Sequence, residues 1–204
     1  MQLLYQTHSP YARKVLVLAH ETRLAARMEV IHHETSPTRR NQAVYDRNPL
    51  GKVPVLIDGA LVLFDSTVIS EHLDALHDGR RRIPANGEKR LLALRMQALA
   101  QGLCEAGIAM RWEIERRPEH LRWPVMREAQ AAKLNAAYNF IENEAELDSA
   151  FNLGEIALAT ALDWIAFRNL PDFREGRPRL AAWFDEVTKR PSMQATTMHG
   201  ETQD

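Results

Sequence analysis

Residues 48–66 read NPLGKVPVLIDGALVLFDS, and this stretch carries most of the information about the fold. It contains two apolar runs, Val53–Ile57 and Leu61–Leu63, which are separated by Asp58-Gly59. An Asp-Gly pair between apolar runs is typical of a tight hairpin turn, so we expect the two runs to pair as antiparallel strands. Pro54 lacks an amide for the ladder, which favours a position at the start or the edge of its strand.

Around this hairpin, the N-terminal part alternates short strands with short helices. Leu3–Tyr5 and Met28–Ile31 are short apolar runs typical of strands. Ser9-Pro10 opens a helix that runs to about Glu21, because a serine hydroxyl caps free amides and proline is tolerated at the first helical position. Asp65-Ser66 opens another helix. The order β-α-β-α-β-β-α requires one mixed sheet with a right-handed crossover in its first half.

The pattern changes after residue 77. Residues 78–87 have the composition of a linker, and the long segments that follow have helical spacing. The predicted helices are Glu88 to about Arg116, Val125 to about Glu144, Leu153–Phe167, and an amphipathic segment from Leu180 to Val187 before a polar tail. The third is apolar nearly all round, which predicts a central buried helix, and Asn152 with Glu155 predicts a structural capping box at its start. We therefore expect a sheet domain over 1–77, a linker over 78–87 and an all-helical domain over 88–204.

Composition excludes several classes of function. The 204 residues include 26 Lys+Arg and 27 Asp+Glu, so the formal charge of −1 argues against a broad nucleic-acid surface. The apolar runs are far shorter than the ~20 residues that a membrane span needs, and the start lacks a secretory pattern. One cysteine, Cys104, excludes an internal disulfide and a cysteine-based zinc cluster, and the histidines lack metal-ligand spacing. We expect a cytoplasmic protein with no metal, nucleic-acid or membrane partner.

Three short motifs could carry chemistry, and each has a plain structural alternative. Ser9 at a helix N-terminus could stabilise an anion such as a thiolate, or it could serve only as a cap. Val53 would present its backbone to an extended peptide if its bond to Pro54 is cis, although most X–Pro bonds are trans. Asp65 and Ser66 could hold an ammonium group and a carboxylate, or they could only cap the following helix.

The order and spacing of three motifs resemble those of the glutathione S-transferase superfamily. The motifs are Ser-Pro-Tyr-Ala at 9–12, the stretch 48–56, and Phe-Asp-Ser-Thr-Val-Ile at 64–69. The resemblance covers essentially the whole chain. It implies a thioredoxin-like N-terminal domain that binds glutathione, an all-helical C-terminal domain, and a homodimer. It also implies roles for four residues. A cis proline would let Val53 pair with the cysteinyl part of glutathione, Asp65 and Ser66 would hold its γ-glutamyl end, and Lys52 would contact its glycine carboxylate.

The segment Ser9–Ala12 also matches the Cys-Pro-Tyr-Cys motif of glutaredoxins, with both cysteines replaced. Dithiol exchange needs two thiols, so the resemblance implies a bacterial, serine-type transferase instead. In such an enzyme the Ser9 hydroxyl donates a hydrogen bond to the glutathione sulfur and favours the thiolate. Thr7 is a competing hydroxyl. Tyr5 is a third, but it shares a strand face with Leu3 and we expect it to pack in the core.

The resemblance implies attack of the glutathione thiolate on a small hydrophobic electrophile. We expect that substrate against Tyr11 and the helix from Glu88, where Met110, Trp112 and Cys104 could form an apolar wall; core packing is the alternative for each. Rival functions are reduction of a peroxide or mixed disulfide by the same thiolate, and binding without catalysis. Maleylacetoacetate isomerase is a narrower rival, but its Ser-Ser-Cys-Ser run is missing. The physiological electrophile stays open.

Overall fold

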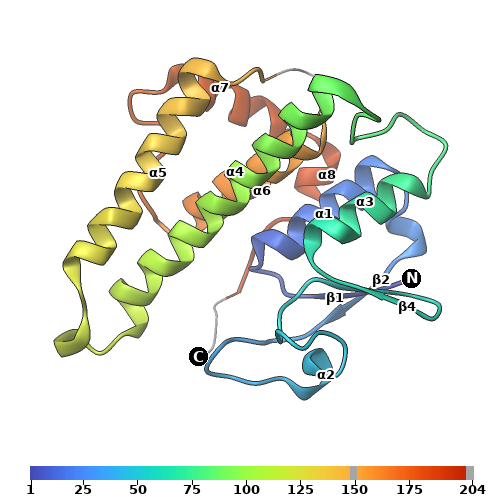
Figure 1. Cartoon of the computed structure of the whole chain (residues 1–204), viewed down its shortest axis with the longest axis horizontal. Coiled ribbons are helices and arrows are strands. Elements are labelled where there is room, and N and C mark those ends of the chain that lie inside the picture. The colour runs from blue at the N-terminus through green and yellow to red at the C-terminus, as the bar shows by residue number, and fades with distance from the viewer. Residues whose placement is uncertain (148–150, 201–204) are drawn as a thin grey trace.

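The computed structural model describes residues 1–147 and 151–200. A small sheet with its helices lies beside a group of long helices (Figure 1). The N-terminal elements are β1 (Gln2–Tyr5), α1 (Pro10–Glu21), the 3₁₀ turn η1 (Ala25–Arg27), β2 (Glu29–His32), α2 (Gln42–Tyr45), β3 (Val55–Asp58), β4 (Leu61–Leu63) and α3 (Ser66–Ala75). The predicted order of strands and helices is confirmed. The whole is a thioredoxin-like sheet unit followed by a helical one, as predicted.

The four strands lie in the order β2-β1-β3-β4. β1 pairs in parallel with β2, and α1 crosses over between them. β3 pairs antiparallel with both β1 and β4, which confirms the Asp58-Gly59 hairpin. Gly59 has a φ of +61°, a left-handed conformation that glycine adopts without steric cost.

Each face of the sheet is covered by different helices. Side chains alternate along a strand, so Leu3 and Leu56 belong to the core beneath α1 and α3. Leu4 and Val55 point the other way and pack with Val44 of α2 in a smaller cluster. Figure 1 shows α1 and α3 on one side of the sheet and α2 on the other.

The second half of the chain is helical. Its elements are α4 (Gly87–Arg111), the π-helical turn η2 (Trp112–Arg116), the 3₁₀ turn η3 (Glu119–Leu121), α5 (Pro124–Glu144), α6 (Leu153–Phe167), α7 (Pro178–Val187) and α8 (Pro191–Gln194). α6 is buried along nearly its whole length and packs against both α4 and α1, as its apolar sequence predicts. Asn152 and Glu155 form the expected capping box. None of the helices in the described ranges is long and apolar enough to span a membrane.

Two parts of the helical half differ from the sequence prediction. The helix predicted to reach Arg116 changes to π geometry at Trp112, where an extra residue enters the turn. The segment predicted as polar tail contains the four-residue helix α8, in which Ser192 and Met193 are buried. Four residues are too few for a helical period to be visible, so only packing identifies this helix. Residues 201–204 of that tail lie outside the described residues.

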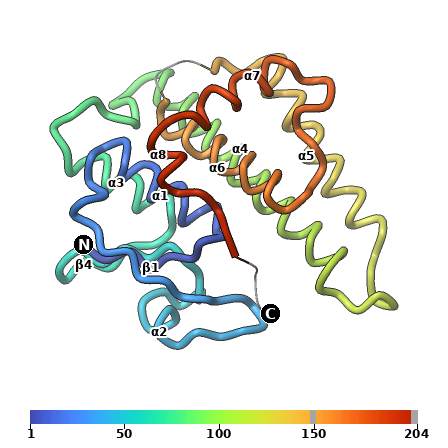
Figure 2. Tube along the Cα trace, turned by 180° about the vertical axis from the view of Figure 1, so that it is seen from behind, coloured from blue at the N-terminus to red at the C-terminus, as the bar shows by residue number. Residues whose placement is uncertain are grey.

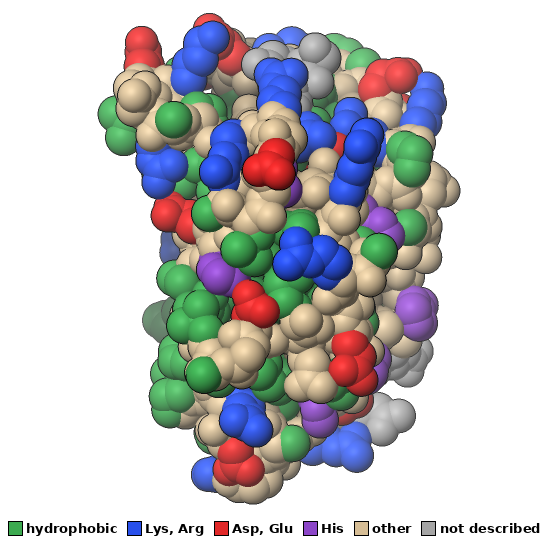
Figure 3. Space-filling model, turned by 90° about the vertical axis from the view of Figure 1, so that its right-hand side faces the viewer, with side chains coloured by type: hydrophobic (Ala, Val, Ile, Leu, Met, Phe, Trp, Pro, Cys, Tyr) green, Lys and Arg blue, Asp and Glu red, His purple; other side chains and the backbone are tan. Residues whose placement is uncertain are grey.

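The predicted linker lies between α3 and α4, where residues 76–86 form no helix or strand. The division into domains at 77 and 88 stays a prediction. On the face that lies to the right in Figure 1, basic side chains are interspersed with acidic and apolar ones and form no unbroken stripe (Figure 3).

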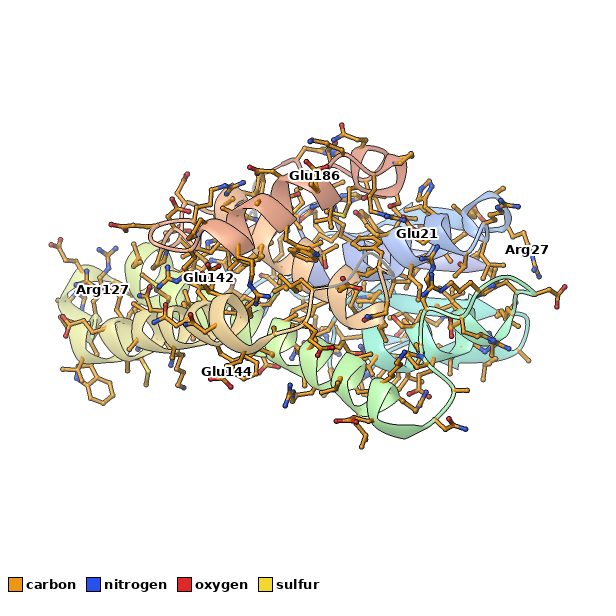
Figure 4. All side chains as sticks on the ribbon, turned by 90° about the horizontal axis from the view of Figure 1, so that it is seen from above. Glu21, Arg27, Arg127, Glu142, Glu144 and Glu186 are labelled. Atoms are coloured by element: carbon orange, nitrogen blue, oxygen red, sulfur yellow. The ribbon has the colours of Figure 1, made fainter. Side chains whose placement is uncertain are left out.

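Two charged residues of α1 connect the halves of the molecule. Arg13 is only 1% exposed and ion-pairs with Asp163 of α6; it also donates to the Met193 carbonyl and to Thr196. Glu21 accepts two hydrogen bonds from Arg190, at 2.9 and 2.8 Å, and its carboxylate lies 2.9 Å from Arg82. Glu21, which is labelled in Figure 4, thus joins α1, the linker and the C-terminal segment.

Glu21→Gln should lower the free energy of unfolding by about 3 kcal/mol, because it leaves two arginines without their shared counter-ion in a largely buried place. Chemical denaturation measures this change. Glu186→Gln is the matched control: Glu186 also pairs with a cation, Lys189 at 2.6 Å, but its side chain is 73% exposed. The control variant should lower the free energy of unfolding by less than about 1 kcal/mol. Equal losses in the two variants would contradict a junction role for Glu21.

The same contact predicts a pH dependence. Burial by itself would raise the pKa of Glu21, but hydrogen bonds from Arg190 and Ser192 outweigh it and lower the pKa. A carboxyl group with a depressed folded-state pKa stabilises fully above its ordinary value of ~4.3 and loses that contribution as pH falls below it. The difference in free energy of unfolding between the wild type and Glu21→Gln should therefore stay constant near neutral pH and become smaller in acid.

Candidate active site

Ser9 is the N-cap of α1, directly after the loop that follows β1. Its backbone is extended, with φ −90° and ψ 116°, and its Oγ accepts a hydrogen bond from the Ala12 amide at 3.2 Å. Pro10 occupies the first turn, as predicted. Capping uses a lone pair of the oxygen, so the Ser9 O–H proton remains available for a ligand. The cap and the functional role are therefore compatible.

The two competing hydroxyls have other surroundings. Tyr5 is 5% exposed and packs with Leu3 in the core, and burial raises the pKa of its phenol. The Thr7 Oγ1 lies 3.4 Å from Nε2 of His32. Gly200 of the C-terminal segment lies beside it, since a Cβ on Gly200 would lie 3.4 Å from the same oxygen. Figure 2 shows this segment running back from α8 towards β1.

His8 adds no positive charge beside Ser9. Its ring is 5% exposed, and its Nε2 lies 3.6 Å from a carboxylate oxygen of Glu34. Burial lowers the pKa of His8 to about 4, although Glu34 acts in the opposite direction. The imidazole is therefore neutral at pH 7. Anion stabilisation at this place would rest on the hydroxyl and on the helix terminus.

The Val53–Pro54 peptide bond is cis, as the family resemblance implies. The Val53 side chain packs with Leu4 and Val55 on the α2 side of the sheet. Its amide and its carbonyl have no hydrogen-bond partner among the described residues, because β3 begins only at Val55. Val53 therefore offers one donor and one acceptor to an extended ligand.

The loop before Val53 is held by its own side chains. Asn48 donates to the Lys52 carbonyl at 2.8 Å and accepts from the Leu50 amide at 3.0 Å. Gly51 has a φ of +63°, and a Cβ there would lie 2.2 Å from the Tyr45 ring, so only glycine fits. The Lys52 side chain is exposed. This loop presents Lys52 to solvent while it fixes the backbone that leads to Val53.

The N-terminus of α3 carries two polar groups that the helix itself leaves unused. Asp65 caps the helix through Oδ1, which accepts from the amides of Thr67 at 2.9 Å and Val68 at 3.5 Å. Its second oxygen has no hydrogen bond within the described ranges, and neither has the hydroxyl of Ser66, a residue that is 3% exposed. A carboxylate and a hydroxyl at a helix N-terminus can hold an ammonium group and a carboxylate side by side.

Strand direction brings these groups to one edge of the sheet. β1 runs antiparallel to β3, so the end of β1, which leads to Ser9, lies beside the start of β3, which follows Val53. β4 is antiparallel to β3 in turn, so its end, which leads to Asp65, lies at the same edge. Lys52 precedes Val53 there, but within the described residues its side chain forms no hydrogen bond or ion pair with the other predicted site residues.

Sequence reasoning missed one charged side chain near this edge, Lys14. The Lys14 side chain is 4% exposed. It lies on the same side of α1 as Tyr11 and Leu18. The i, i+3, i+7 spacing of these three residues is the signal that could have found it.

Of the three side chains considered for an apolar wall, Cys104 belongs to the core. It is 3% exposed, and burial raises the pKa of its thiol to about 12, so the thiol stays protonated. Met110 and Trp112 are half-buried. No group of three or more His, Cys, Asp or Glu side chains in the described part of the chain is arranged to hold a metal ion.

Two family models match the chain. Residues 8–76 match the N-terminal domain of glutathione S-transferases, and residues 113–186 match their C-terminal domain. Among curated proteins, the GST-like protein YibF of Escherichia coli is 28% identical over 203 residues, covering 96% of this chain and 98% of YibF.

Solved structures agree with these matches. A glutathione transferase family member from Pseudomonas fluorescens, solved with bound glutathione, is 39% identical; the alignment covers 98% of this chain and 99% of that one, with a TM-score of 0.94. A glutathione S-transferase from Methylobacillus flagellatus, also with glutathione bound, is 31% identical, with coverage of 97% and 99% and a TM-score of 0.84. Sequence motifs, fold and near-complete coverage lead to the same conclusion: the chain belongs to the glutathione S-transferase family.

Proposed function

We propose that this chain is a serine-type glutathione transferase in which the Ser9 hydroxyl donates a hydrogen bond to the sulfur of bound glutathione. The double role of Ser9 carries the proposal: its oxygen caps α1 through the Ala12 amide, while its proton has no acceptor among the described residues. A donor at a helix N-terminus favours a thiolate over a thiol. A shift of one pKa unit corresponds to ~1.4 kcal/mol, which one such hydrogen bond can supply.

The remaining groups at this edge fit the other parts of glutathione. The unpaired backbone of Val53 would pair with the cysteinyl residue, Asp65 and Ser66 would take the γ-glutamyl end, and Lys52 would contact the glycine carboxylate. Two structures of the Pseudomonas fluorescens relative support glutathione as the ligand, since one contains glutathione and the other S-(propanoic acid)-glutathione. They are 39% and 38% identical to this chain.

The proposed reaction joins the thiolate sulfur to an electrophilic carbon of a small hydrophobic substrate. In a substitution, the new C–S bond forms as the leaving group departs with its electron pair. In an addition to an activated double bond, the neighbouring carbon receives the π electrons and then a proton from water. Both reactions start from the same thiolate, and the substrate would lie beside Ser9 and Tyr11.

We also propose that the enzyme is a cytoplasmic homodimer. Val68 of α3 and Leu91 of α4 are 47% and 68% exposed. The two helices are joined by a hydrogen bond from Gln97 to Thr67 at 3.1 Å. Large exposed apolar side chains on neighbouring helices favour a protein contact. Light scattering should give twice the 23.3 kDa chain mass, and Leu91→Glu should shift the protein towards monomer. A monomeric wild type would contradict the dimer.

Ser9→Ala should raise the pKa of bound glutathione by at least about one unit and lower kcat/KM by roughly 10- to 100-fold, because the thiolate loses its donor. Thiolate absorbance against pH measures the first quantity, and turnover of a generic aryl halide measures the second. The affinity for glutathione should change little. Thr7→Ala is the control and should leave both quantities near wild type. If Thr7→Ala rather than Ser9→Ala changes them, Thr7 and not Ser9 donates to the sulfur.

Asp65→Asn should weaken glutathione binding by about 10-fold while the protein stays as stable as the wild type. Asparagine caps a helix as well as aspartate does, so this variant removes the charge and keeps the cap. Asp65→Ala, by contrast, should also cost ~1 kcal/mol of stability. Calorimetric titration with glutathione checks the affinity, and unchanged binding by Asp65→Asn would remove Asp65 from the site.

A further inference from the structure

Lys14 is a buried cation without a partner. Its side chain lies on the second turn of α1 and is 4% exposed, yet no hydrogen bond or ion pair within the described residues involves its ammonium group. Burial lowers its pKa to about 8. A buried ammonium group is destabilising unless it is paired, so its presence here needs an explanation.

The neighbouring residue shows how unusual this is. Arg13 is also buried on the same helix, and its guanidinium donates to Asp163, the Met193 carbonyl and the Thr196 hydroxyl. The fold therefore satisfies one buried cation of α1 fully and leaves the next one unpaired. Arg13 is explained by the contact between the two halves of the molecule, and Lys14 is not.

Lys14 belongs to α1, which packs directly against α3, the helix that Asp65 caps. The Asp65 carboxylate acts on Lys14 and favours its charged form, but the two groups do not form an ion pair within 4 Å. Cys104 also faces Lys14, and its thiol stays protonated. Tyr11 belongs to the same cluster: burial is the main cause of its raised pKa, and Cys104, Glu105 and Asp65 add to it.

The packed helices α1 and α3 thus carry three polar groups that have no hydrogen bond or ion pair within the described residues. They are the ammonium group of Lys14, the second carboxylate oxygen of Asp65 and the hydroxyl of Ser66. One cation, one anion and one hydroxyl complement the head of an α-amino acid, which carries an ammonium group and a carboxylate on the same carbon. A ligand carboxylate would give Lys14 a counter-ion, which no described residue of the protein supplies.

Building on the glutathione site proposed above, we propose that Lys14 binds the α-carboxylate of the γ-glutamyl group, together with Ser66, while Asp65 takes the adjacent ammonium group. Lys14 then acts as a specificity residue, because it requires a free α-carboxylate on the ligand. The price of this specificity is a less stable ligand-free protein, as is common for binding sites.

The test compares two ligands whose sulfur is methylated, so that thiol ionisation plays no part. One is S-methylglutathione, and the other is its analogue with 4-aminobutanoyl in place of γ-glutamyl, which lacks only the α-carboxylate. Calorimetry should show that the wild type binds S-methylglutathione about 10- to 100-fold more tightly than the analogue, as for a hydrogen bond to a charged group. Lys14→Met keeps the length of the side chain and should bind both ligands with the weaker affinity.

Thermal unfolding separates this role from a structural one. Lys14→Met removes an unpaired buried charge, so its Tm should equal or exceed that of the wild type. Lys14→Arg should retain part of the preference for S-methylglutathione. The control is Lys133→Met, a change at an exposed lysine of α5, which should alter neither Tm nor affinity.

Two results would overturn the role of Lys14 alone. One is unchanged affinity of Lys14→Met for S-methylglutathione, and the other is an equal loss of affinity for both ligands together with a lower Tm, which would indicate mere support of α1. Each leaves the transferase proposal standing, since that depends on Ser9 and on turnover. If the wild type fails to bind S-methylglutathione at all, both proposals fall.

Discussion

The antiparallel pairing of β1 with β3 is the constraint on which the rest of the molecule depends. Leu3 pairs with Leu56 and Leu4 with Val55, so the two apolar faces of the sheet are in register with the helices that cover them. A shift of one residue would turn every side chain of a strand to the opposite face. The same pairing brings the loop after β1 and the loop before β3 to one edge, where the proposed site lies.

At that edge, single groups serve folding and ligand binding together. Ser9 gives a lone pair to the Ala12 amide and retains its proton. Asp65 uses one oxygen for the amides of Thr67 and Val68 and retains the other. Caps are therefore suited to this use, because a helix N-terminus needs only an acceptor and attracts negative charge. Stability and binding therefore depend on different atoms of the same side chain.

The buried charges of α1 differ in the same way. Glu21 and Arg13 have several partners each, and these contacts join the sheet unit to the helical half. Lys14 has none among the described residues. Charges with full sets of partners suit a structural role, whereas an unpaired charge next to a proposed binding site suits a ligand. This difference, and not burial itself, separates the two roles along one helix.

The sequence by itself determined whatever depends on local pattern. Asp58-Gly59 identified the hairpin, Ser9-Pro10 the start of α1, and Asn152 with Glu155 the start of α6, because turns and caps use neighbouring residues only. Together with the motif resemblance, these patterns predicted the fold class and the family. The tertiary structure alone decided what depends on contacts between distant segments. It buried Lys14 without a partner, joined Glu21 to Arg190, and placed Met193 of α8 in the core, because burial and charge pairing arise only when segments far apart in sequence pack together.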